Sequence, residues 1–114
     1  MAADCLFCKI VARHLPSTEV YRDDQILAIR DIHPVAPTHV LLLPVRHLDS
    51  IAQAEQADRE LIGAMHLAAI KIAAQEGLDN GFRLVINTGH DGGQTVRHLH
   101  IHLIGGRAMH WPPG

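Results

Sequence analysis

The most regular pattern in the chain lies near its C-terminus, where residues 98–104 alternate between histidine and aliphatic residues. A period of two is typical of a half-buried β-strand. The imidazoles of His98, His100 and His102 would therefore share one face, with the leucine and isoleucine side chains turned into a core. Side chains two residues apart on a strand stand about 6.6 Å from each other. Neighbouring imidazoles at that spacing can hold both ends of one small charged group.

Elsewhere the pattern predicts two helices and four further strands. A short helix is expected over residues 6–13, and a long one over residues 55–76, where apolar residues recur at helical spacing. The strands are expected at residues 19–22, 26–30, 40–43 and 82–87, with the histidine strand as the fifth. Residues 31–39 contain two prolines and predict an irregular connection. This order predicts an α+β fold with a five-stranded antiparallel sheet, in which the wholly apolar strand 40–43 is central.

Length and charge narrow the classes of protein that fit. A chain of 114 residues suffices for a single domain, residues 1–114. The net charge of −2, with scattered lysines and arginines, argues against binding to long nucleic acid. No apolar run reaches the ~20 residues that span a bilayer, and the N-terminus lacks the pattern of a signal peptide. We therefore expect a cytoplasmic protein that does not bind membranes.

Two cysteines, Cys5 and Cys8, form a CxxC pair near the N-terminus. A structural disulfide is disfavoured in a reducing compartment, which leaves half of a zinc site, a redox pair or two buried thiols. One CxxC pair is a weak signal by itself. The ten histidines of the chain favour a metal.

The histidine row has two chemical interpretations. Neutral imidazoles are common zinc ligands, but an imidazole can also attack phosphorus and form a covalent phosphohistidine. Gly92 and Gly93 precede the row in a polar loop that could turn backbone N–H groups toward an anion. Because a metal site has no use for several N–H donors, the loop and Thr95 favour a phosphate site that contains a nucleophile.

Taken together, these motifs resemble the histidine triad (HIT) family. Residues 98–104 fit its motif of alternating histidine and apolar residues, and residues 92–95 are similar to the loop before it. Residues 31–41 resemble the family's nucleoside-binding segment. The C-terminal tail, residues 105–114, is similar to the ending of the Hint branch, the purine nucleoside phosphoramidases.

The resemblance implies roles for the residues of the motif. His100 matches the family's nucleophile, with one ring nitrogen held by a backbone carbonyl so that the other is free to attack. His102 and His39 match residues that contact the phosphate and the bridging atom. Gln94 and Thr95 match residues that bind phosphate oxygens and steady the leaving group.

The resemblance also implies a nucleotide-binding site and a metal site. Asp31 would accept the ribose hydroxyls, and Asn87 would support the ribose and phosphate together with the loop at Gly93. The base pocket would be lined by Leu6, Phe7, Ile10, Leu15 and Ile32. Some bacterial-type members complete a CxxC zinc site with two histidines, which here match His47 and the first triad histidine, so the implied zinc ligands are Cys5, Cys8, His47 and His98.

The expected activity is hydrolysis of the P–N bond of purine nucleoside phosphoramidates, such as adenosine 5′-monophosphoramidate and aminoacyl- or lysyl-adenylate analogues. Two alternatives are a dinucleoside polyphosphate hydrolase and a nucleotide-binding regulatory module with little turnover. The resemblance further implies a homodimer with one sheet continuous across both subunits. Trp111 in the tail is then expected to reach the partner's active-site rim. Four histidines receive no role: His14, His33, His66 and His90.

Overall fold

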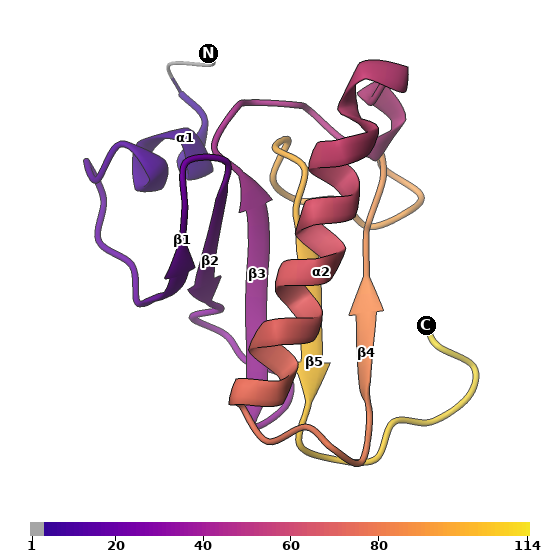
Figure 1. Ribbon diagram of the computed structural model, residues 1–114. Helices are drawn as coiled ribbons and strands as arrows, with labels where there is room; N and C mark the ends of the chain where they lie inside the picture. Colours follow the sequence, from indigo (N-terminus) through magenta and orange to yellow (C-terminus); the bar gives the residue numbers. More distant parts are fainter. Residues whose placement is uncertain (1–3) are drawn as a thin grey trace.

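The computed structural model describes residues 4–114 and has a five-stranded antiparallel sheet as its centre (Figure 1). The strands follow the order β1-β2-β3-β5-β4. Their bounds are β1 Glu19–Arg22, β2 Ile26–Arg30, β3 Thr38–Pro44, β4 Phe82–Val85 and β5 Ile101–Gly105. Two α-helices accompany the sheet, α1 Leu6–Val11 and α2 Arg59–Gln75. The predicted fold class is confirmed.

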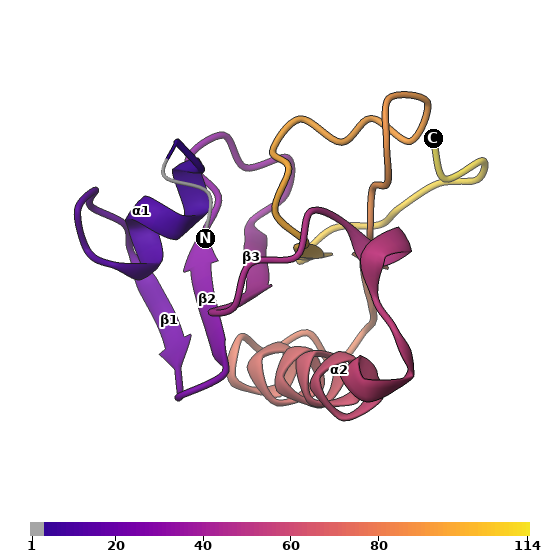
Figure 2. The same cartoon turned by 90° about the horizontal axis from the view of Figure 1, so that it is seen from above.

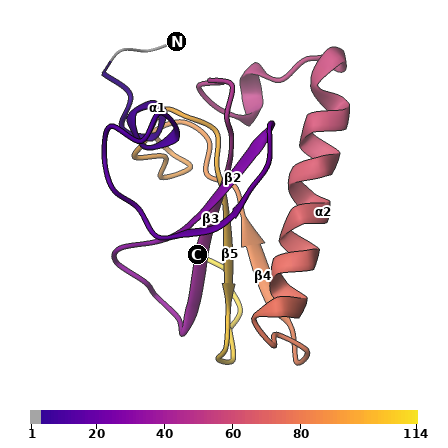
Figure 3. The same cartoon turned by 60° about the vertical axis from the view of Figure 1, so that its left-hand side comes forward.

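Each face of the sheet carries its own hydrophobic cluster. Seen from above and from the side, α2 lies on one side of the sheet, and α1 with the β4–β5 loop lies on the other (Figures 2 and 3). Strand β3 is central and buried along its whole length, as its apolar run predicts. Because side chains alternate along a strand, Val40 and Leu42 pack with α2, whereas Leu41 and Leu43 pack with α1.

Both helices are shorter than predicted. Helix α1 ends at Val11 because the chain turns at Arg13, whose φ of 63° is left-handed and incompatible with a continuing helix. The predicted long helix begins later than expected, since residues 51–53 and 56–58 form separate 3-10 turns. Reciprocal hydrogen bonds between Glu55 and Asp58 close the second turn, and α2 starts at Arg59.

The histidine strand also starts later than its alternation predicts. Strand β5 pairs with Thr38–Leu42 of β3 only from Ile101 to Gly105, so His98 and His100 precede the ladder. Here the backbone has other partners, since the Leu99 amide donates to the Leu48 carbonyl at 2.6 Å. The side chains of this segment still alternate between the two faces of the sheet, and Leu99, Ile101 and Leu103 pack in the hydrophobic cluster beneath α2. Strand β4 likewise ends at Val85, before residues 86–87.

Within residues 4–114, no helix combines the length and the apolar character needed to cross a membrane.

Candidate functional site

A cleft with a volume of about 640 Å³ opens on the α1 side of the sheet. Its apolar wall comes from α1, from the segment after α1 and from the loop after β2, and its polar end is formed by the histidines. The predicted residues among its lining are Leu6, Phe7, Ile10, Leu15, Asp31, Ile32, His39, Thr95, His100 and His102. The structure thus brings these predicted residues, which are far apart in the sequence, to one cleft.

His100 is buried at the cleft, with 6% of its surface exposed, and its ring orientation is set by the backbone. Its Nδ1–H donates to the carbonyl of His98 at 2.7 Å. The Phe7 ring makes a T-shaped contact with it, with 5.0 Å between the ring centroids and 90° between the ring planes. Burial lowers the pKa of His100, which favours the neutral imidazole. A neutral ring protonated at Nδ1 leaves an unshared electron pair on Nε2.

His102 lies beside His100 and belongs to a short hydrogen-bonded chain. The Val35 amide donates to Nδ1 of His39 at 3.2 Å, so the neutral His39 ring carries its proton on Nε2. That Nε2–H donates to Nδ1 of His102 at 2.9 Å and lies 3.4 Å from the Asp31 carboxylate. The neutral His102 ring is therefore an Nε2–H donor. Burial and the nearby His100 and His39 lower its pKa to about 4.

The second cluster joins Cys5, Cys8, His47 and His98, whose ligand atoms all lie within 4.8 Å of one another. Nδ1 of His98 is 3.4 Å from Sγ of Cys5 and 3.6 Å from Sγ of Cys8, and Nδ1 of His47 is 3.3 Å from Sγ of Cys8. Ligand atoms around a tetrahedral zinc lie roughly 3.3–3.8 Å apart. The donor set and its spacing therefore fit zinc.

The second ring nitrogens of the two histidines support the same conclusion. Nε2–H of His98 donates to the Pro44 carbonyl at 2.8 Å, and Nε2–H of His47 donates to Asp49 at 2.6 Å. In the neutral rings both Nδ1 atoms then carry lone pairs, and these atoms are only 3.1 Å apart. A cation between them removes the repulsion, and a carboxylate or carbonyl behind a ligating histidine is the usual outer support of a metal site.

Asp31, His39 and His102 also bring three potential ligand atoms together. Their hydrogen bonds differ from those of the cysteine cluster, because the Val35 amide occupies Nδ1 of His39. The proton on Nε2 of His39 then points at the other two members. This group is a hydrogen-bonded network aimed at the cleft, whereas the cysteine cluster presents lone pairs.

Comparison with known proteins agrees with this geometry. The model of the HIT domain matches residues 12–109. The chain belongs to the HIT family. It is 51% identical to a 14 kDa zinc-binding protein of Brassica juncea, over 97% of this chain and all of that protein. It is 50% identical to a HIT-like protein of Synechococcus elongatus over the full length of both.

Two solved structures extend the comparison. A HIT family hydrolase from Legionella pneumophila superposes with a TM-score of 0.96 at 49% identity, over 97% of this chain and 100% of that one. A histidine triad protein from Clostridium difficile superposes with a TM-score of 0.92 at 43% identity, covering 96% of each chain. The chain thus has the fold of HIT family hydrolases, and the names of its relatives are consistent with the Hint-type branch.

Part of the predicted HIT site lies outside the lining of the cleft. The amides of Gly93 and Gln94 donate to carbonyls at His90 and Gly89 within their own loop, rather than facing an anion as the glycine pattern suggested. The Gln94 side chain donates to the Asp49 and Val96 carbonyls. Asn87 donates to the Gly92 carbonyl, so both side chains hold the loop. Trp111 is 84% exposed.

The structure adds residues that the sequence did not single out. Val96, Ser17 and His33 line the cleft, and Asp49 supports His47. The only sequence feature that pointed to Asp49 is its position, two residues after the candidate metal ligand His47. Nothing in the sequence indicated that the Val35 amide would orient His39.

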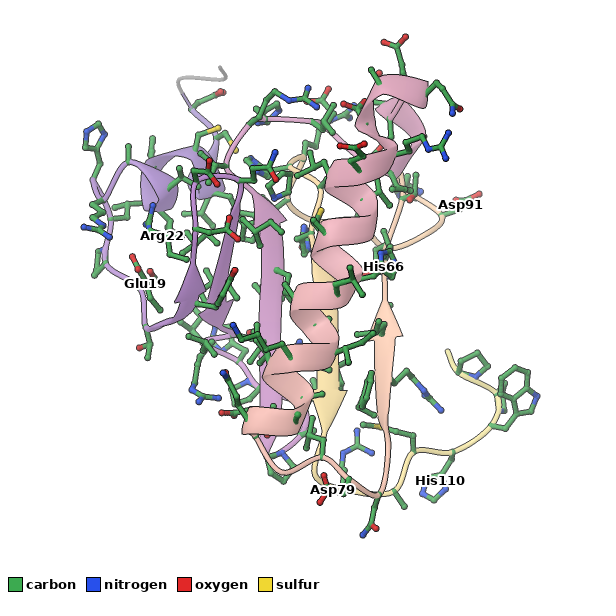
Figure 4. The ribbon with its side chains drawn as sticks, in the orientation of Figure 1. Glu19, Arg22, His66, Asp79, Asp91 and His110 are labelled. Carbon is green, nitrogen blue, oxygen red and sulfur yellow. The ribbon has the colours of Figure 1, made fainter. Side chains whose placement is uncertain are left out.

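The histidines without a predicted role mostly lie elsewhere. His66 is on α2, away from α1 (Figure 4). His66 donates from Nδ1 to the Ile62 carbonyl at 2.7 Å, and the exposed His90 pairs with Asp91. His33 is the exception because it borders the cleft.

Proposed function

We propose that this HIT family member hydrolyses the P–N bond of purine nucleoside phosphoramidates, with adenosine 5′-monophosphoramidate as the simplest substrate. The observation that carries this proposal is the state of His100. Its Nδ1–H is engaged with the His98 carbonyl, its pKa is lowered by burial, and it borders an apolar cleft large enough for a nucleoside. A neutral imidazole with Nε2 unprotonated is a nucleophile at neutral pH.

The reaction has two displacements at phosphorus. Nε2 of His100 attacks the phosphorus and forms a P–N bond to the ring. The substrate nitrogen takes up a proton from solvent, the original P–N bond breaks, and the neutral amine leaves with the electron pair of that bond. Water then attacks the nucleotidyl-histidine, releasing the nucleoside monophosphate and a proton and regenerating the imidazole. A protonated amine is a good leaving group, so neither displacement requires a metal at the phosphate.

The groups beside His100 are proposed to bind the substrate. Nε2–H of His102 and the hydroxyl of Thr95 would donate to phosphate oxygens, where charge builds in the transition state. Asp31 would accept the ribose hydroxyls, and the apolar wall would hold the base. Gln94 and Asn87 would act on the phosphate through the loop that they hydrogen-bond.

We further propose that zinc is bound by Cys5, Cys8, His47 and His98 in a structural role. The ion would join the N-terminal segment to the chain that follows β3 and to the chain that precedes β5. Four protein ligands leave no open position for a substrate, which is the pattern of structural zinc sites.

Replacement of His100 tests the proposed nucleophile. His100→Ala is expected to lower kcat/KM for adenosine 5′-monophosphoramidate by roughly 10³-fold or more, because the covalent route is lost. His14→Ala, an exposed histidine without a role in the site, serves as the matched control and should keep wild-type turnover. Release of the nucleoside monophosphate is followed by chromatography, and rapid quenching should trap nucleotidyl-histidine on the wild type only. Undiminished hydrolysis by His100→Ala would refute the mechanism.

A further inference from the structure

Helix α1 contributes side chains to both sites at once. Cys5 is the N-cap of the helix and Cys8 lies within it, and both belong to the cysteine cluster. Leu6, Phe7 and Ile10 of the same short segment line the nucleotide cleft. A helix of six residues has little stability of its own, so its position depends on what it is tied to. Anything that moves the two cysteines therefore also moves one wall of the cleft.

Phe7 makes the most direct link between the sites. Its ring, 4% exposed, contacts His98 at 5.9 Å and 73° and His100 at 5.0 Å and 90° between centroids and planes. Edge-to-face packing of this kind contributes to orientation as well as to burial. One phenyl ring thus touches both a candidate metal ligand and the proposed nucleophile.

The backbone of His98 provides a second link. Nδ1 of its ring belongs to the cysteine cluster, and Nε2–H donates to the Pro44 carbonyl. Its own carbonyl accepts the Nδ1–H of His100 at 2.7 Å. A displacement of the His98 ring is therefore transmitted through one residue to the hydrogen bond that sets the His100 tautomer.

We propose that Phe7 is a positioning residue which, together with the His98 carbonyl, couples metal binding at the cysteine cluster to nucleotide binding in the cleft. This inference rests on the proposed function of the cleft. The metal-loaded protein binds nucleotide more tightly than the metal-free protein. Because coupling between two sites is reciprocal, nucleotide raises the affinity for the metal by the same factor.

The physical cause lies in the metal-free cluster. Without a cation, Nδ1 of His47 and Nδ1 of His98 face each other with lone pairs at 3.1 Å, and only thiol hydrogen bonds join the rings to Cys5 and Cys8. A thiol is a weak donor, so α1 is held less firmly than it would be by bonds to a shared cation. Phe7 shifts with α1, and the T-shaped contact between its ring and the His100 imidazole loosens.

The test measures two affinities on the full-length chain. Adenosine monophosphate is titrated by calorimetry into zinc-loaded and chelator-treated protein, and zinc release to a chromogenic chelator is measured with and without adenosine monophosphate. We expect both ratios to be about 10-fold, within the range usual for coupled sites. The ¹⁵N NMR signals of His100 should report the Nδ1–H tautomer in the zinc-loaded protein and a mixture of tautomers after zinc removal.

Two variants in α1 separate the coupling from simple damage to the cleft. Phe7→Leu keeps an apolar side chain and all four metal ligands but removes the ring, so the coupling ratio should fall to about two or less. Ile10→Val is the matched control, since Ile10 lines the same cleft from the same helix but carries no ring. Whatever its affinity for adenosine monophosphate, its coupling ratio should stay at the wild-type value.

Equal affinity for adenosine monophosphate with and without zinc in the wild type would overturn the proposal. So would a wild-type ratio in Phe7→Leu, which is also the result expected if chelation merely unfolds the chain. The proposed function fails separately. If the wild-type protein does not hydrolyse phosphoramidates but its nucleotide affinity still depends on zinc, the proposed reaction alone is refuted. If it hydrolyses them but binds nucleotide equally with and without zinc, the coupling alone is refuted.

Discussion

His39 and His100 border the same cleft, yet the backbone gives their rings opposite tautomers. An amide donates to Nδ1 of His39, whereas a carbonyl accepts from Nδ1 of His100. His39 therefore presents an N–H to its surroundings, and His100 presents a lone pair. Identical side chains acquire different chemistry from single backbone atoms, which explains how a row of histidines can supply both a nucleophile and hydrogen-bond donors.

Asp31 offers a residue-scale test of ribose recognition. Its Oδ1 accepts from the His33 amide at 2.7 Å, and its other oxygen borders the cleft near His39. Asp31→Asn keeps the shape but replaces a charged acceptor with a neutral one. Because hydrogen bonds to a charged group contribute about 1.5–3 kcal/mol, we expect KM for adenosine 5′-monophosphoramidate to rise about 10-fold with little change in kcat, as measured by steady-state kinetics.

The 2′-deoxy substrate is the control for this prediction. In the wild type, removing the 2′-hydroxyl should raise KM, and in Asp31→Asn the same removal should have little further effect, because the partner is already weakened. Equal losses with the two proteins would show that Asp31 does not bind that hydroxyl.

The lowered pKa of His102 predicts a pH dependence of stability. In the unfolded chain the imidazole takes up a proton near its ordinary pKa of 6.5, but in the folded protein it does so only near 4. Between those values the unfolded state binds more protons, so the free energy of unfolding falls as the pH falls from 6.5 to about 4. In urea denaturation, His102→Gln should lose less stability than the wild type between pH 7 and pH 5. An equal loss of stability in both proteins would show that the pKa of His102 does not cause the pH dependence.

At the scale of elements, the sequence predicted what depends on local pattern. The apolar run 40–43 identified the central strand, and the helical spacing of apolar residues located α2. The start of the histidine strand was missed because the Leu99 amide bonds to Leu48, a residue far away in the sequence. The helix boundaries were missed because Arg13 turns with positive φ and because two 3-10 turns precede α2.

The candidate site shows the same division. The cleft and the cysteine cluster were anticipated by resemblance, since no spacing rule joins Cys5 to His98 across 93 positions. The His100 tautomer was expected from the resemblance, but those of His39 and His98 were out of reach, because they depend on backbone atoms of Val35 and Pro44 that any residue type could supply. Sequence thus indicates which side chains gather, and tertiary structure decides which of their atoms face the substrate or the metal.

Metal removal is predicted to destabilise the protein through α1. The ion would bind only the folded arrangement of Cys5, Cys8, His47 and His98, and a ligand present at about 1,000 times its Kd stabilises a fold by about 4 kcal/mol. For a chain of this size, that corresponds to a decrease in Tm of roughly 10–20 °C on chelation. Differential scanning calorimetry with and without chelator measures it.

The control for this prediction is Cys8→Ser, which removes one ligand. Its Tm should already be low, and chelator should lower it little further. A wild-type Tm that does not respond to chelator, in protein shown by elemental analysis to have contained zinc, would exclude a structural role for the ion.

At the scale of the whole molecule, a second group of exposed apolar side chains lies apart from those that line the cleft. Leu67 and Ile70 on α2 are 68% and 55% exposed, and Phe82 at the start of the edge strand β4 is 41% exposed. Exposed apolar side chains on neighbouring elements are typical of a surface that a partner covers. The HIT resemblance implies a homodimer, and we propose that two copies pair through this surface of α2 and β4.

The last prediction joins this surface to the tail. Leu67→Lys should shift the protein from dimer to monomer in analytical ultracentrifugation, because a charge would be buried in the interface. Thr18 is an exposed residue just before β1, at the opposite edge of the sheet, and the Thr18→Lys protein should remain dimeric.

Since Trp111 is exposed on its own chain and does not line its own cleft, its proposed action on the partner's rim requires the dimer. Leu67→Lys, Trp111→Ala and removal of residues 107–114 should therefore alter the preference among alkyl- and aminoacyl-phosphoramidates in the same direction, with little change in the Tm of the tail variants. A monomeric Leu67→Lys protein with the wild-type substrate profile would show that the tail does not act across the subunit boundary.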